Sequence, residues 1–356
     1  MSNQTDQLWA VLQENGLVQG EPPERGVSGS PWYVKVLIAF SGWLAAIFIF
    51  GFIGVTFEFV FKSSSVACVV GIFMIGGAFT LLRIPSNDFV EHLGLAVSMA
   101  GQALITYAIF GIYGHNKVVA WLLLAALQCA LVAFMPNFIH GVFSSLIAVI
   151  VFSMALNEMD IPNFIGGVVI FGASFCWLNE FHYPQHMKKI RAIGYGLVLA
   201  LIVLESMVIF GYRAFGDRLL QDYHGFLTYP WLGEGIIGAV SVYIVWGLLR
   251  RYGQPMNGRL SMTTLLATLF LCAVSMNVQG ITVGMVIVCF GFFGTNRVLL
   301  GLGIVSLLFY ISSYYYLLDT TLLSKSQSLL MVGLVLLCIR WLMHRIIPVQ
   351  NEVRHE

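Results

Sequence analysis

Charged residues are scarce in this chain. Only 10% of its 356 residues are Asp, Glu, Lys or Arg, whereas 58% are hydrophobic, and the mean hydropathy is +0.85. Soluble domains carry about 25% charged residues, so this composition excludes both a soluble domain and a disordered chain. The net charge of +1 leaves no global field that would gather nucleic acid or another polyanion. Most of the chain must therefore lie in a lipid bilayer.

Motifs of known chemistry are also missing. The six cysteines stand singly inside apolar runs, without the paired spacing of a metal site or a disulfide framework. No phosphate-binding glycine loop, HExxH or GxSxG motif occurs. The histidines are spread over separate loops and helix ends, which makes an intramembrane enzyme the least favoured function. We expect neither a metal nor a cofactor.

The first 30 residues are polar and lack the basic stretch followed by an apolar core that marks a secretory signal. Leu8, Trp9 and Leu12 are close to helical spacing, and Gly16 stands where a helix would stop. This pattern predicts a short amphipathic helix over about residues 4–15, lying on the membrane or on the protein. We expect a cytoplasmic segment over 1–30, a transmembrane domain over 31–347 and a cytoplasmic tail over 348–356.

The apolar runs predict an all-α, polytopic bundle. A helix needs about 20 apolar residues to cross about 30 Å of hydrocarbon. Cutting the sequence at its polar breaks gives about twelve spans. They cover residues 36–58, 65–82, 92–113, 118–135, 138–156, 162–181, 192–211, 231–249, 260–276, 280–294, 298–318 and 326–347. The break at 276–280 is the least distinct of these boundaries, so counts of ten or eleven spans are the alternatives.

The distribution of lysine and arginine orients these spans. With both termini in the cytoplasm, 13 of the 18 cations fall in cytoplasmic segments, and the other five are Lys62, Lys117, Arg213, Arg218 and Lys325. Cytoplasmic loops carry the excess of Lys and Arg in membrane proteins. The distribution therefore favours an even number of spans with both termini inside.

Few acids fall within the predicted spans, and each needs a reason because a charge at bilayer depth costs a few kcal/mol. Glu205 is the deepest, about two thirds of the way along span 192–211. It fits a proton or cation site and an interhelical hydrogen-bond anchor equally well. Glu180 lies near the cytoplasmic end of span 162–181, close to Lys188 and Lys189, where a structural role is favoured.

Two other polar groups allow a functional interpretation and a simpler one. Asn277 and Gln279 separate spans 260–276 and 280–294, as a broken transporter helix would, but we favour an ordinary turn.

Glu158, Asp160 and Asp319 share the outer face. Each also flanks a helix end, where a carboxylate is common, so we do not expect them to hold a metal.

Two blocks of residues resemble a known family. The first block comprises Gly16, Leu17, Val18, Pro31, Trp32, Tyr33, Gly42, Trp43, Leu44 and Ala45. The second comprises Gly291, Phe292, Asn296, Arg297, Leu299, Gly301, Leu302, Gly303, Ile304, Tyr315, Tyr316, Leu317, Thr321, Leu322, Lys325 and Ser326. Over essentially the whole chain the sequence is similar to an uncharacterised family of bacterial multi-pass proteins, domain of unknown function 4401. The resemblance implies a bacterial inner membrane and a neighbouring gene for a small membrane-anchored protein with a GDYxxLxY motif. It implies no activity and no catalytic residue.

The second block adds candidate binding residues. Tyr315, Tyr316, Asp319 and Lys325 form a polar and aromatic group at the outer end of span 298–318, and Asn296 and Arg297 begin that span. The leading hypothesis is a protein that acts with a membrane-anchored partner in transport or envelope sensing, with the outer group as the contact. The alternatives are a secondary transporter that uses Glu205 as its proton or cation coupling site, and a structural membrane scaffold.

Overall fold

The structure is a computed structural model, and it describes a large part of the chain. The described residues are 11, 13–16, 37, 40–41, 44–45, 47–48, 51–52, 58–83, 88–159, 161, 164–211, 230–251, 258–276, 280–317, 321–324, 326–327, 330, 333–334, 337 and 341. Within them, every regular element is a helix. The all-α prediction is thus confirmed for this part of the chain.

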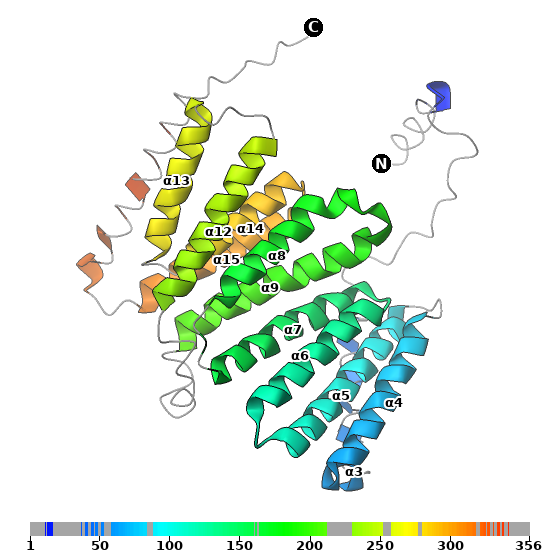
Figure 1. The fold of residues 1–356 in the computed structure, drawn as a ribbon. Helices are drawn as coiled ribbons and strands as arrows, with labels where there is room; N and C mark the ends of the chain where they lie inside the picture. Colours follow the sequence, from blue (N-terminus) through cyan, green and yellow to red (C-terminus); the bar gives the residue numbers. More distant parts are fainter. Residues whose placement is uncertain are drawn as a thin grey trace.

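Consecutive helices run antiparallel through the bundle, and two groups of them lie next to each other (Figure 1). The first group consists of α3 (Glu58–Lys62), α4 (Ser64–Arg83), α5 (Asp88–Tyr113), α6 (Lys117–Phe134) and α7 (Phe138–Glu158). The second consists of α8 (Ile165–Asn179), two short 3₁₀ turns (Glu180–His182 and Pro184–His186), α9 (Met187–Gly211), α12 (Pro230–Arg251), α13 (Arg259–Ser275), α14 (Ile281–Phe293) and α15 (Arg297–Leu317). The contact between α7 and α9 joins the groups.

Asparagine side chains start several of these helices. The Asn116 side chain accepts a hydrogen bond from the Val119 N–H at 3.2 Å and caps α6, and Asn137 accepts one from the His140 N–H at 2.9 Å and caps α7. A cap satisfies a backbone donor that the first turn of a helix leaves unpaired. The polar breaks used to cut the sequence are therefore real helix starts at these positions.

Small residues let the helices approach closely. A Cβ at Gly71 of α4 would lie 2.8 Å from the carbonyl oxygen of Gly101 on α5, and one at Gly196 of α9 would lie 1.7 Å from Ser145 Oγ on α7. Between helices in lipid, such close contact replaces the hydrophobic driving force of soluble cores. A buried cluster that includes Leu201, Ile237 and Ile287 joins α9, α12 and α14.

The structure describes fewer long spans than the sequence predicts. In the described part, seven helices are long and apolar enough to cross a membrane, namely α4, α5, α6, α7, α9, α12 and α15. The predicted spans 162–181, 260–276 and 280–294 contain helices, but α8, α13 and α14 have only 15, 17 and 13 residues. At 1.5 Å per residue, α14 is about 20 Å long, short of the hydrocarbon thickness.

The remaining predictions fall on positions that are largely undescribed. Spans 36–58 and 326–347 lie mostly outside the described residues, as does most of the expected helix over 4–15. Val11, Gln13 and Glu14 are helical, and Gly16 follows them with a φ of +68°, a conformation that suits glycine at a helix stop. The structure supports a multi-pass helical protein, and twelve spans stays a prediction.

Candidate functional site

Two buried acids meet at one end of the second helix group. Glu205 lies in the last third of α9, and Glu234 lies in the first turns of α12; their side chains are 6% and 5% exposed. The two side chains lie close enough for their carboxyl groups to interact. Because α9 and α12 run in opposite directions, a residue near the end of one and a residue near the start of the other share the same depth.

The break between α13 and α14 supplies donors to this pair. Ser275, the last residue of α13, donates its hydroxyl to Glu234 Oε2 at 2.8 Å, and the Gly280 N–H donates to Oε1 at 2.9 Å. The Thr282 N–H in turn donates to Ser275 Oγ at 3.2 Å. Glu234 therefore sits at the N-terminus of α14, where the helix dipole favours a negative charge.

Gly280 is required at this position. Its φ is +86°, and a Cβ there would lie 2.8 Å from the ring of Tyr310 on α15, which is fully buried. On another side of the site, a Cβ at Gly166 of α8 would lie 3.8 Å from Glu205 Oε1. Helices α8, α9, α12 and α14 thus all reach the carboxyl pair, and α15 packs against Gly280 beside it.

The closeness of two buried carboxyl groups limits the charge that they carry together. Two carboxylates would repel each other in this nonpolar environment, which favours keeping a proton on one of them. Glu234 already accepts from Ser275 and Gly280, which favours the charge on Glu234 and the proton on Glu205. Neither ion pair between described side chains, Lys117 with Glu158 and Arg191 with Glu180, involves the carboxyl pair.

Sequence reasoning found Glu205 and missed Glu234. A usable signal was present, because the two acids lie on either side of one predicted outer loop, each a few residues inside its predicted span. Asn277 and Gln279 lie outside the described residues, but Ser275 and Gly280 show that the ends of this break bind a carboxylate.

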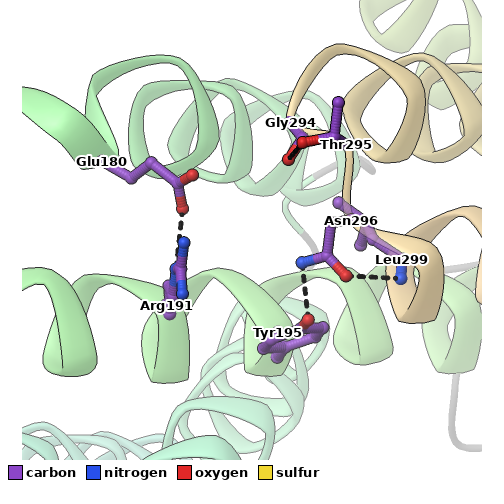
Figure 2. A network of polar contacts seen from close by, with 7 residues as sticks. All are labelled: Glu180, Arg191, Tyr195, Gly294, Thr295, Asn296 and Leu299. Carbon is purple, nitrogen blue, oxygen red and sulfur yellow. Dashed lines mark hydrogen bonds and ion pairs between the residues drawn. The ribbon is translucent and has the colours of Figure 1, made fainter. Parts of the chain in front are cut away.

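The predicted residues Glu180 and Asn296 belong to a separate network at the opposite end of α9 (Figure 2). Glu180 is 2% exposed and accepts a hydrogen bond from Arg191 Nε at 3.1 Å. The Asn296 Nδ2 group donates to the Tyr195 hydroxyl at 2.6 Å, and Asn296 Oδ1 accepts from the Leu299 N–H and caps α15. These contacts hold the start of α9 against the 3₁₀ turn after α8 and against the turn before α15. Their role is therefore structural.

The remaining predicted residues do not gather at one place. Tyr315 and Tyr316 lie in the last turns of α15, with Tyr316 78% exposed and the two rings edge to face at 5.6 Å. Arg297 is exposed at the first residue of the same helix, about 27 Å away along its axis. Asp319 and Lys325 lie outside the described residues.

A second buried polar network joins α5, α6 and α7, and sequence reasoning missed it as well. His140 is 1% exposed; its Nε2 lies 2.8 Å from Ser98 Oγ and its Nδ1 lies 3.1 Å from Ser144 Oγ. Gln128 Nε2 donates to Gln102 Oε1 at 2.9 Å. Such bonds hold helices together within a bilayer. Among the residues that the structure describes, no three His, Cys, Asp or Glu side chains are placed to hold a metal ion.

Comparison with known proteins agrees with the resemblance in the sequence. The family model described as "Domain of unknown function (DUF4401)" matches residues 31–346, which is nearly the whole chain. No curated protein and no solved structure matches the chain. The helices long enough to span a membrane agree with a multi-pass membrane protein. The chain belongs to the DUF4401 family.

Proposed function

We propose that the protein is a proton-coupled secondary transporter in which the Glu205–Glu234 pair takes up and releases the coupling proton. The observation that carries this proposal is the meeting of two buried carboxyl side chains beside the break between α13 and α14. Acids inside a membrane domain are costly, and those that occur there are typical of proton relays and ion pathways.

The surroundings of the pair support a role that depends on protonation. Secondary transporters place their sites where helices are broken and helix N-termini point at an anion. Here the break between α13 and α14 ends at Gly280, whose N–H donates to Glu234. If Glu205 lost its proton, two carboxylates would face each other in a nonpolar bundle. Their repulsion would favour a different arrangement of α9 and α12, which is the differential stability that coupling requires.

Proton coupling can be tested before the substrate is identified. Everted membrane vesicles from cells that overproduce the protein are acidified inside by respiration, and the gradient is followed with a pH-sensitive dye. Organic acids, amino acids, sugars and inorganic cations are then tested one class at a time. Each is added outside the vesicles to detect exchange for protons, and is loaded inside them in a second series to detect co-transport with protons. We expect at least one class to dissipate the gradient in wild-type vesicles, and Glu205→Gln and Glu234→Gln to abolish that response.

The control is Glu158→Gln. Glu158 is also an outer-end acid, but it pairs with Lys117 at 3.8 Å, so its replacement should leave the response intact. The proposal is overturned if no solute class dissipates the gradient, or if the Glu205→Gln vesicles respond like wild type. Either result would favour a structural membrane scaffold over a transporter.

The topology and the partner also belong to the proposal. We propose twelve spans with both termini in the cytoplasm of a bacterial inner membrane, because the lysine and arginine distribution favours that arrangement. A membrane-anchored partner would contact the outer group at Tyr315, Tyr316, Asp319 and Lys325, and the exposed ring of Tyr316 supports this. The neighbouring GDYxxLxY protein should co-purify with wild type and be lost with Tyr316→Ala and Lys325→Ala; an intact complex in both would exclude the contact.

A further inference from the structure

A cavity of about 420 Å³ opens among the ends of α4, α5, α6, α7 and α9. The cation distribution assigns this end of the bundle to the cytoplasm. Its lining includes Arg83, the last residue of α4, and Lys188 and Lys189 in the first turn of α9. Ligand pockets in proteins measure about 300–1,000 Å³, so the cavity is large enough for a small polar group.

The charges in the lining favour an anion. The lining contains three cations and one carboxylate, that of Glu91, which accepts a hydrogen bond from Asn137 Nδ2. Lys189 is held in place because its Nζ donates to the Ala133 carbonyl at 2.8 Å. In a chain with 10% charged residues, three lining cations are a marked concentration.

The same cavity has an apolar wall formed by Leu82, Val132 and Ile193. A site for a small soluble ion needs no such wall, whereas a phospholipid places apolar carbons directly beside its phosphate. Basic pockets between transmembrane helices on the cytoplasmic side are known to bind lipid head groups. Arg83 is further fixed by its guanidinium, which lies 4.5 Å from the centre of the Phe79 ring.

We propose that this cavity binds a phosphate group, held by Arg83, Lys188 and Lys189, with the apolar wall against the carbons that bear it. The ligand is an anionic phospholipid head group or a soluble phosphate ester, because both present the same group. The site shares no side chain with the Glu205–Glu234 pair, so it does not depend on the proposed transport function.

The test compares the full-length protein in nanodiscs of equimolar phosphatidylglycerol and phosphatidylcholine. Native mass spectrometry after release from the disc counts the lipids that each variant retains. Wild type should retain phosphatidylglycerol selectively, and Lys188→Gln combined with Lys189→Gln should weaken that retention by about twenty-fivefold. The expectation follows from about a fivefold contribution of each lysine near an anionic head group.

Two further variants keep the test decisive. Arg250→Gln removes a cation from the same side of the bundle, at the end of α12, and should leave retention unchanged. Lys188→Gln alone spares the Lys189 bond to Ala133, so a loss of about fivefold there cannot come from a broken helix contact.

A second measurement separates the two sources of phosphate. Thermal unfolding of the protein in a neutral detergent is followed with and without glycerol phosphate. If glycerol phosphate stabilises wild type but not the double lysine variant, and lipid retention is equal in both, the ligand is the soluble ester. If neither phosphatidylglycerol nor glycerol phosphate distinguishes wild type from the double variant, the proposal is wrong.

Discussion

Glu205→Gln and Glu234→Gln are chemically identical changes at positions of nearly equal burial, yet the structure predicts that their effects on stability differ. A protonated Glu205 can donate a hydrogen bond to Glu234, and a glutamine amide at the same position can donate in the same way. Glu205→Gln therefore imitates the form already present. Glu234 accepts from Ser275 and Gly280, and an amide there has only one acceptor oxygen for the two donors.

The size of the difference follows from these bonds. Hydrogen bonds to a charged group contribute about 1.5–3 kcal/mol, and neutral ones about 1 kcal/mol. Glu234→Gln converts one charge-assisted bond into a neutral bond and leaves one buried donor without its acceptor, a total loss of about 3 kcal/mol. Glu205→Gln keeps its donor and removes no acceptor that the structure uses, so its loss should stay below about 1 kcal/mol.

Intrinsic tryptophan fluorescence during thermal unfolding in one detergent, at one pH and one protein concentration, provides the comparison. We expect the order wild type, Glu205→Gln, Glu234→Gln, with Glu205→Gln close to wild type. Ser275→Ala, which removes one donor, should fall between the two glutamine variants. Equal losses in both, or a larger loss in Glu205→Gln, would refute the assignment of the proton to Glu205 and of the charge to Glu234.

Two further predictions use the same unfolding assay. Gly196→Ala should destabilise the α7–α9 contact by about 2 kcal/mol, because the new Cβ would lie 1.7 Å from Ser145 Oγ. The control Gly247→Ala, whose Cβ would have nothing within 4 Å, should be close to neutral. Equal stability of the two variants would contradict the close approach of α7 and α9. Asn296→Ala removes both the cap of α15 and the bond to Tyr195 and should cost about 2 kcal/mol, against about 1 kcal/mol for Tyr195→Phe, which removes only the bond. If the two cost the same, the cap contributes nothing measurable.

Hydropathy predicted where helices lie better than it predicted how long they are. The runs over 65–82, 92–113 and 118–135 became α4, α5 and α6 with ends displaced by only a few residues. The runs over 162–181 and 280–294 became helices of 15 and 13 residues, because Glu180 begins a 3₁₀ turn and Gly280 takes a left-handed φ. A hydropathy window measures apolar length and is blind to these local backbone conformations.

Sequence reasoning could identify only one of the two acids of the candidate site. A single deep acid, Glu205, stands out in an apolar run, whereas Glu234 stands beside Pro230 and Trp231 and resembles an interfacial residue. Its burial results from the packing of α12 against α8 and α14, contacts between segments far apart in the chain. The partner of Glu180 shows the same limit. Lys188 and Lys189 are closer in sequence, but Arg191 faces the carboxylate from the next turn of α9.

The two proposed sites occupy opposite ends of one helix. Lys189 lies in the first turn of α9 and Glu205 in its last third, 16 residues and so about 24 Å apart along the axis. Substitutions separated by more than about 10 Å without shared partners normally act additively. Removing the lysines should therefore leave the contrast between Glu205→Gln and Glu234→Gln unchanged. If that contrast were lost in the lysine background, the two ends would be coupled, and α9 is the helix that carries residues of both sites.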